Sequence, residues 1–403
     1  MRYSKVSLTM AFGSCLLISD FSLATTIGSD SNLKFSQTAG GMAGAGYARP
    51  QDAVASVFGN PASLTQLNGN TDFTFGASYL NVGNDLTTDG SVMPVGSGSM
   101  EAEHYLLPTM AVRQRLTDKA VFGLGFQAVG GLGSDYRTSQ ALDPTVTYLN
   151  FGANMDFAYA ISPKTSVGVA MTLAYGVLEV GLISTTAIQE TFGVRGGLGL
   201  THDLGPVMLS VNYNSELEME FNDVIQSDTS GNYSDFTLEQ PQEVILGIAS
   251  TPAMWENLLI EADVIYKNWD NATGYKDIWK DTFTLQLGSQ YTLNKLQFRA
   301  GYSYTTDLRK DSEDLGNSIS GLSTLNVGGA TTPVGPAVLQ FVTASLAHPF
   351  WNHNVTVGIG YEINSNLRAD AQAGIAFGDD QSFGGNKTTA EAFTVGAGLS
   401  WSF

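Results

Sequence analysis

The stretch FTVGAGLSWSF, residues 393–403, decides the fold, because it alternates apolar and small side chains up to an aromatic end. Every second position is apolar: Phe393, Val395, Ala397, Leu399, Trp401 and Phe403. A period of two is typical of a strand with two different faces. At the edge of a soluble sheet such a strand would invite aggregation. The pattern therefore favours the closing strand of a membrane barrel, with its apolar face toward lipid.

The same alternation recurs along the chain, first in DFTFGASYLNV at residues 72–82. Tight turns such as Ser162-Pro163-Lys164 alternate with long polar loops, as in bacterial outer-membrane barrels. We expect strands near 71–82, 103–116, 120–130, 146–161, 165–178, 190–202, 207–221, 236–250, 258–269, 281–293, 296–308, 353–363, 367–378 and 391–403. The sequence thus predicts an all-β fold, a 14-stranded antiparallel transmembrane β-barrel over residues 71–403.

One stretch before the barrel, Gln37–Leu64, lacks a strand period and is rich in Gly and Ala. Its glycines include Gly40, Gly41, Gly44 and Gly46. Glycine lets backbones approach closely, so the stretch fits a plug packed inside the barrel lumen. On composition alone a flexible linker explains it equally well.

Residues 1–24 carry the pattern of a secretory signal peptide, because Arg2 and Lys5 precede the short apolar run Val6–Ile18. Small residues then precede an expected cleavage after Ala24. The single cysteine, Cys15, would leave with this peptide, so we expect neither disulfides nor thiolate metal sites in the mature chain.

The chain is acidic, with a formal net charge of −19. Such acidity argues against nucleic acid as a partner, since no basic patch is present to neutralise phosphates. An exported, acidic, Gly-rich chain without an apolar run of about 20 residues after residue 24 has the composition of a barrel in the outer membrane of a Gram-negative bacterium.

Several segments together resemble the FadL family of outer-membrane channels for long-chain fatty acids and aromatic hydrocarbons. They are the Gly/Ala-rich stretch ending in Asn60, Pro61 and Ala62, the segment LTDKAVFGLGFQAVGGLGSDY (116–136), YKNWDN (266–271), the strand pair at 283–304 and the aromatic carboxyl end. The resemblance covers essentially the whole mature chain. It implies that residues 25–70 form a hatch inside the lumen, with Gly40, Gly41, Gly44, Gly46, Asn60, Pro61 and Ala62 among its residues.

The resemblance also implies a route, in which ligand passes from outer loops to a lumenal pocket and leaves sideways into the membrane. The exit lies at a kink in the third strand, which we expect to end near Gly130, Gly131 and Gly133. Glycines can interrupt a ladder or tolerate a bulge. The alternative is the start of a flexible loop.

Two outer loops differ in length from what the resemblance leads us to expect or are notable for their composition. The loop at Glu179–Glu190 is short where fatty-acid channels often have a long helical loop. The longest loop, Arg309–Asn352, contains the apolar run Pro336–Ala347, which is either a capture surface for apolar ligands or a helix packed over the barrel mouth. We favour the capture surface.

A fatty-acid channel needs an apolar pocket and a cation for the carboxylate. By alternation, inward cations are Arg113, Arg115, Arg195, Lys267, Arg299 and Arg368, and inward acids are Asp156, Glu218, Glu261, Asp263 and Asp370. Most should form ion pairs that brace hatch against wall, because unpaired buried charge is costly. Lys267 and Arg195 are the candidates for ligand contact. A pocket without a free cation would favour an uncharged aromatic hydrocarbon.

We expect no enzyme, no catalytic residue, no cofactor and no metal site, because the four histidines show no metal spacing and no nucleophile elbow occurs. The predicted function is passive uptake of hydrophobic compounds, most simply long-chain fatty acids, by a monomer in contact with outer-membrane lipid. The alternatives are an aromatic hydrocarbon channel, an adhesin and a hydrolytic barrel. A general porin would conflict with a plug.

Overall fold

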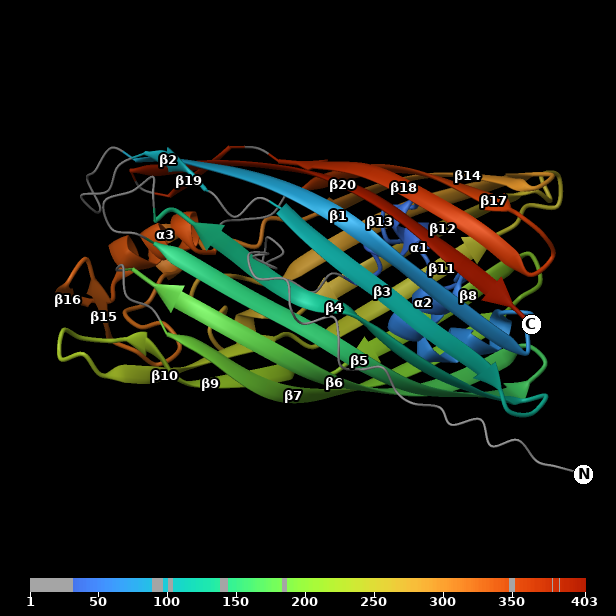
Figure 1. Ribbon diagram of the computed structural model, residues 1–403, viewed down its shortest axis with the longest axis horizontal. Helices are drawn as coiled ribbons and strands as arrows, with labels where there is room; N and C mark the ends of the chain where they lie inside the picture. The colour runs from blue at the N-terminus through green and yellow to red at the C-terminus, as the bar shows by residue number, and fades with distance from the viewer. Residues whose placement is uncertain are drawn as a thin grey trace, which may run out of the picture.

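The computed structural model describes residues 32–88, 97–100, 104–137, 144–182, 187–347, 352–378, 380–383 and 385–403, so the predicted signal peptide, residues 1–24, lies outside the described residues. Strands close into one barrel, because β1 (Thr71–Thr88) pairs with both β3 and the last strand β20 (Asn386–Ser402) (Figure 1). The other wall strands are β3 (His104–Arg115), β4 (Ala120–Asp135), β5 (Thr145–Ser162), β6 (Thr165–Gly181), β7 (Ile188–Asp203), β8 (Val207–Asn214), β11 (Glu243–Ser250), β12 (Leu258–Lys267), β13 (Thr282–Leu293), β14 (Leu296–Thr305), β17 (His353–Glu362) and β18 (Leu367–Phe377).

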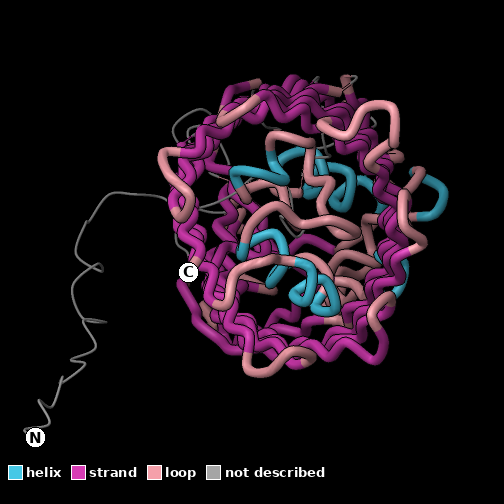
Figure 2. The backbone as a smooth tube through the Cα atoms, turned by 90° about the vertical axis from the view of Figure 1, so that its right-hand side faces the viewer, coloured by secondary structure: helices cyan, strands magenta, loops and turns pink. Residues whose placement is uncertain are grey.

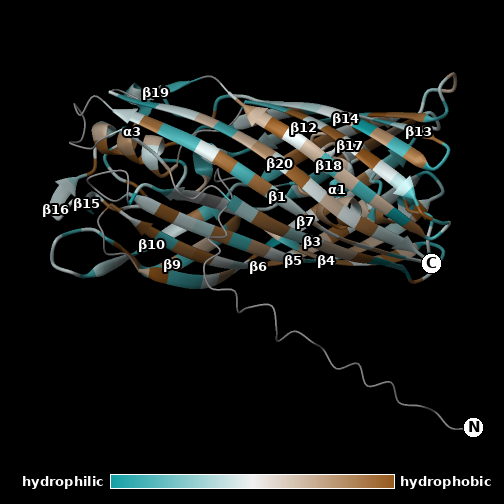
Figure 3. Ribbon diagram, turned by 45° about the horizontal axis from the view of Figure 1, so that its top comes forward, coloured by the Kyte–Doolittle hydropathy of each residue, from teal (hydrophilic) through white to brown (hydrophobic). Residues whose placement is uncertain are grey.

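The predicted 14-stranded antiparallel barrel is therefore confirmed, with the short strands β2 (Gly98–Ser99) and β19 (Gln381–Phe383) extending its rim. The wall strands present apolar side chains outward. Their inward side chains are small or polar beside residues 32–66 and apolar toward the opposite end, as with Leu80, Val82 and Leu86 of β1. In β1, Phe73 and Phe75 are exposed, whereas Thr74 and Ser78 are buried. Figure 3 shows this alternation as brown residues repeated along the strands. An apolar outer surface suits lipid, while the inner face can bind a polar filling.

The two ends of the barrel differ. Tight turns, such as Asn294-Lys295 between β13 and β14, lie at the end that also carries the carboxyl terminus (Figure 1). At the opposite end lie the hairpin of β15 (Thr324–Val327) and β16 (Ala330–Pro333), and the helix α3 (Pro336–Ser345). Among the residues that the structure describes, no helix is both long and apolar enough to cross a membrane.

Two predicted strands are wrong in part. We expected 207–221 and 236–250 to run through the wall, but the wall strands β8 and β11 cover only Val207–Asn214 and Glu243–Ser250. The remaining residues form a separate hairpin of β9 (Leu217–Gln226) and β10 (Tyr233–Gln240). Its buried residues, which include Leu217, Met219 and Phe221, pack into the apolar core of the lumen. An alternating period is the same in both settings, so periodicity could not separate them.

Residues 32–66 lie within the ring of strands (Figure 2). We call them the hatch segment, since they fall within the hatch expected at residues 25–70. The segment contains α1 (Gln37–Gly40), α2 (Ala53–Phe58) and the 3₁₀ helix η1 (Pro61–Gln66). Each begins at a polar N-cap whose side chain accepts a backbone N–H bond: Ser36, Asp52 and Asn60. These caps let three short turns form where no long helix could.

Candidate functional site

The wall accommodates the hatch segment because glycines face it from inside the barrel. A Cβ on Gly168 (β6) would lie 2.4 Å from the backbone nitrogen of Ala62, and one on Gly301 (β14) would lie 2.1 Å from the carbonyl carbon of Met42. Such distances leave no room for a side chain at either position. Wall glycines therefore allow the backbone of the segment to touch the backbone of the wall.

The predicted hatch glycines serve the same close packing from the other side. A Cβ on Gly41 would lie 3.0 Å from the Cα of Gly358, and one on Gly40 would lie 2.0 Å from the Oε1 atom of Gln372. Gly44 has a φ of +94°, a conformation that other residues rarely adopt. The structure brings these residues against the inner wall, while their role in gating stays a prediction.

Polar wall side chains bind the hatch backbone. Gly46 N donates to Asp263 Oδ2 at 3.1 Å, and Ala48 N donates to Glu261 Oε1 at 2.7 Å. Asn60 Nδ2 donates to the carbonyl oxygens of Leu200 at 3.2 Å and Val211 at 3.0 Å. Pro61 and Ala62 follow it in η1. Because these bonds reach several strands, the segment is held as part of the barrel interior.

Several of the inward charges predicted from alternation form ion pairs, whereas Glu261 and Asp263 bind the hatch backbone instead. Arg113 Nη1 lies 2.8 Å from Asp72 Oδ2, and its Nε donates to the Leu64 carbonyl at 2.8 Å. Asp370 binds both Arg299 at 2.8 Å and Arg368 at 2.7 Å. The predicted inward acids and cations do lie inside with one exception. Glu218 is exposed on β9, because that segment leaves the wall.

The two candidate ligand contacts, Lys267 and Arg195, meet at one carboxylate. Glu243 Oε2 lies 3.8 Å from Lys267 Nζ, and Glu243 Oε1 lies 4.0 Å from Arg195 Nη1. Lys267 also donates to Asn32 Oδ1 of the hatch segment at 2.7 Å. The arrangement is that of a buried ion cluster, and contact with a ligand stays a prediction.

A second lysine, Lys34 of the hatch segment, lines the same small polar cavity as Lys267. This cavity measures about 20 Å³ and is also lined by Trp269 and Gln286. Burial lowers the pKa of Lys34 to about 8. Positive charge at this position is therefore costly near neutral pH.

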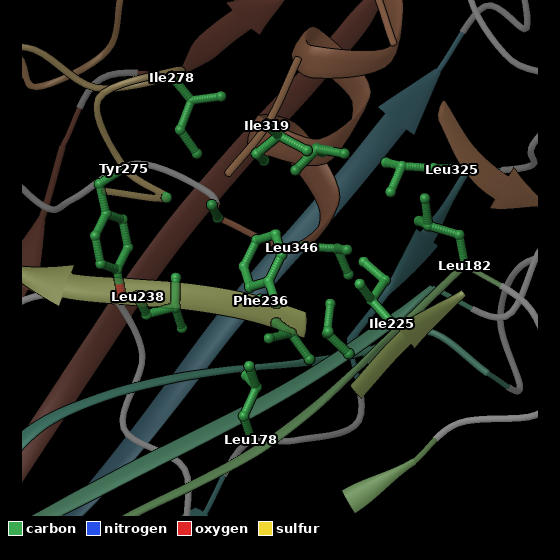
Figure 4. A pocket seen from close by; sticks show the side chains of 15 residues that line it. Leu178, Leu182, Ile225, Phe236, Leu238, Tyr275, Ile278, Ile319, Leu325 and Leu346 are labelled. Atoms are coloured by element: carbon green, nitrogen blue, oxygen red, sulfur yellow. The ribbon is translucent and has the colours of Figure 1, made fainter. Parts of the chain in front are cut away.

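A different cavity, of about 60 Å³, lies under the outer end of the barrel and is lined by apolar side chains (Figure 4). Figure 4 shows that they come from wall, hairpin and loop alike. The residues are Val146, Leu178, Val180, Leu182, Ile225, Phe236, Leu238, Gly274, Tyr275, Ile278, Ile319, Leu325, Val342, Leu346 and Ala347. None of these described lining residues carries a charged side chain. Sequence reasoning missed this set, although the apolar alternation of residues 217–238 was its signal.

Three aromatic rings connect the linings of the two cavities. Tyr275 lines the apolar cavity and stacks on Trp279 with ring centroids 4.5 Å apart. Trp269, which lines the polar cavity, packs edge-on against both, at 5.0 and 4.9 Å. All three rings are buried. The connection from the apolar to the polar cavity is therefore filled by aromatic side chains.

The apolar run Pro336–Ala347 forms α3 and covers the apolar cavity. Val342, Leu346 and Ala347 line the cavity, and Leu339 and Phe341 are fully buried. The favoured interpretation of this run as an exposed capture surface is wrong, since its large apolar side chains face the core. The alternative, a helix packed over the barrel mouth, matches the structure.

The wall is interrupted beside the predicted glycines of β4. The ladder between β3 and β4 ends at Thr109 and Gln127, although both strands continue beyond it. Between β4 and β5 the register shifts between Ala128 and Gly130, which marks a bulge. Contrary to expectation, Gly130, Gly131 and Gly133 lie within β4 and not at its end. Their role as a lateral exit stays a prediction.

Within the described part of the chain, no cluster of three or more His, Cys, Asp or Glu residues could hold a metal ion.

The sequence matches one family of known proteins. The family model "Outer membrane protein transport protein (OMPP1/FadL/TodX)" matches residues 31–234. No curated protein matches the chain at a significant level.

Solved structures share the fold at low sequence identity. The toluene transporter TodX of Pseudomonas putida is 16% identical, with a TM-score of 0.66 over 91% of this chain and 97% of that chain. The toluene transporter TbuX of Ralstonia pickettii is 17% identical, with a TM-score of 0.63 over 93% and 99%. The monoaromatic hydrocarbon channel CymD is 18% identical, with a TM-score of 0.60 over 92% and 98%.

Proposed function

The chain belongs to the OmpP1/FadL/TodX family of outer-membrane transport proteins. We propose that the transported substrate, called the passenger below, is an uncharged, ring-sized hydrophobic compound of the monoaromatic hydrocarbon class. The protein is a β-barrel channel of the Gram-negative outer membrane for hydrophobic compounds, and its family consists of transport proteins and not enzymes. What we propose beyond this is which hydrophobic compounds the channel transports.

One observation carries the choice of substrate: among the described residues that line the apolar cavity, none has a charged side chain. A carboxylate buried there without a cation would be costly, whereas a hydrocarbon needs only apolar contacts. The volume of the cavity is about 60 Å³, so it would have to expand less for a single ring than for a long acyl chain. The solved structures with this fold include channels for toluene and other monoaromatic hydrocarbons, which agrees with the proposal.

The proposed route begins at α3, continues in the apolar cavity and ends at the interruption between β3 and β4. The hatch segment blocks the lumen beyond the cavity, so a passenger would leave sideways into lipid. Diffusion would need no energy input, because the passenger moves from water to an apolar phase. The channel would act as a monomer.

Long-chain fatty acids are the second candidate, and a specific observation favours them. Lys34 and Lys267 line the polar cavity that the aromatic rings of Trp269 and its neighbours separate from the apolar one. If the rings parted, an acyl chain could occupy the apolar cavity while its carboxylate met the two ammonium groups. This candidate needs a rearrangement that the hydrocarbon does not need.

Binding to the purified protein in detergent tests the proposal. Trp279 stacks on the cavity residue Tyr275, so its fluorescence reports cavity filling. We expect saturable quenching by toluene and little by myristate. Leu178→Asn, inside the cavity, should weaken toluene binding about tenfold, as expected for 1.4 kcal/mol of lost affinity. Leu173→Asn on the outer face of the same strand is the matched control, since Leu173 is exposed.

Tighter binding of myristate than of toluene would overturn the proposal. If that binding also disappeared in Lys34→Met, the fatty-acid candidate would replace it. Equal effects of the two asparagine variants would show that toluene does not occupy this cavity.

A further inference from the structure

A buried amide lies against the inner side of β4, next to the wall interruption. The side chain of Gln240, the last residue of β10, is fully buried, and its Nε2 lies 3.4 Å from the carbonyl oxygen of Val129. A Cβ on Gly130 would lie only 1.8 Å from the same Nε2 atom. Gly130 is therefore needed so that the amide of Gln240 can fill the inner side of the bulge.

The same strand forms part of the cavity. Phe236 and Leu238 of β10 line the apolar cavity, and Gln240 follows two positions later on the same face. Val129, at the bulge, belongs to the same buried apolar cluster as these two residues. A passenger moving from the cavity toward the interruption would therefore have to pass the side chain of Gln240.

Few hydrogen bonds hold this amide in place. Its donor makes one long bond, and its Oε1 atom has no partner among the described residues. Asn150 on β5, which pairs with Gly130, likewise has an amide oxygen without a described partner. Buried amides are normally well bonded, whereas this one would give up only one long hydrogen bond when its side chain rotates. This combination of full burial and weak bonding suits a part that moves.

We propose that Gln240 is the gate residue that closes the lateral opening at the β4 bulge. In the closed state its amide occupies the space beside Gly130. Rotation of the side chain connects the apolar cavity to the gap between β3 and β4. The inference rests on the proposed function only for the identity of the passenger, because the gate itself can be tested without any transport.

The test uses Asn150→Cys as a reporter on the inner wall, in a mature chain expected to lack other cysteines. N-phenylmaleimide dissolved in the lipid of proteoliposomes would reach this thiol through the opening, while glutathione in the water quenches reagent that leaves the lipid. We expect Gln240→Ala to speed labelling about tenfold, the factor that corresponds to 1.4 kcal/mol of gate closure. Gln240→Met keeps most of the volume of the side chain, so labelling should stay slow.

Asn154→Cys is the matched control, since Asn154 lies on the same strand but is covered by the hatch segment, where its Nδ2 donates to the Val57 carbonyl. The labelling rate of Asn154→Cys should be the same whether residue 240 is Gln, Ala or Met. Equal labelling of Asn150→Cys in the parent and in Gln240→Ala would overturn the gate. Faster labelling in both Gln240 variants would also overturn it, because the amide volume would then not be what closes the path.

Toluene uptake by cells that express the same variants separates the two proposals. The gate predicts faster initial uptake in Gln240→Ala than in the parent. If labelling responds as expected but neither protein takes up toluene, the gate stands and the proposed passenger fails. If toluene uptake occurs and labelling does not respond, the passenger stands and the gate fails.

Discussion

The inner face of Gly301 touches the backbone of Met42 so closely that a Cβ at residue 301 would lie 2.1 Å from the Met42 carbonyl carbon. Gly301 therefore fixes how deeply the hatch segment sits against β14. The contact joins backbone to backbone, so no side-chain rotation can relieve a clash there. A methyl group at this site has to move either the segment or the strand.

Gly301→Ala should loosen the hatch segment while the barrel still assembles. We expect trypsin to cut after Lys34, in the same segment, about tenfold faster, the factor that corresponds to 1.4 kcal/mol of weaker packing against the wall. The measurement is limited proteolysis of the folded protein in detergent. Gly196→Ala is the control, because a Cβ there meets nothing within 4 Å. Equal cleavage of the two variants would contradict the packing argument.

Asp370→Asn should destabilise the barrel, because Asp370 is the carboxylate shared by Arg299 and Arg368. Removal of one member of a buried ion pair leaves uncompensated charge, so we expect a loss of about 3–5 kcal/mol in the free energy of unfolding. Urea unfolding in lipid vesicles measures it. The exposed pair of Lys387 and Asp380 offers a control, because Asp380→Asn should leave the free energy of unfolding nearly unchanged. Similar losses in both would argue against buried bracing.

The charge of Lys34 should make hatch stability depend on pH. Burial lowers its pKa from 10.5 in the unfolded chain to about 8, so the folded protein binds fewer protons between these values. The destabilisation from the buried charge is therefore fully present below pH 8 and disappears as pH rises toward 10.5. Lys34→Met should be more stable than the parent at pH 7, with the difference shrinking above pH 8. A difference independent of pH would contradict this account.

A protein that lacks residues 25–64 should still assemble its barrel. The deletion should abolish the selectivity of the channel for hydrophobic compounds. The wall is held by its own ladders, including 17 residue pairs between β1 and β20. Without the hatch segment the part of the lumen that it occupies should fill with water, because polar wall side chains such as Glu261 and Asp263 face that space. We expect ion conductance in planar bilayers to rise well above that of the full chain. Unchanged selective uptake after the deletion would count against a hatch role for this segment.

The barrel could be predicted from sequence because lipid imposes a strict rule on every outward position. Phe393, Trp401 and their partners had to be apolar, and that repeats with period two. The hatch was readable as the one segment without that period. The ion pair between Arg299 and Asp370 could also be predicted, because alternation places both residues on the inner face.

The site itself could not be predicted in the same way. Phe236 and Leu238 obey the strand period of a wall yet belong to an inward hairpin, and only long-range packing distinguishes the two. The position of Gln240 beside Gly130 joins residues 110 positions apart, which no local pattern reveals. The apolar run at Pro336–Ala347 has the same composition whether it faces solvent or core, so its direction depended on the tertiary fold.

The decisive measurement is the uptake of labelled toluene and labelled oleate, side by side, in cells that lack their own channel. We predict that cells expressing this chain take up toluene faster than cells with an empty vector, and that oleate uptake stays at the vector level. Uptake of oleate without toluene, from a correctly assembled barrel, would contradict it.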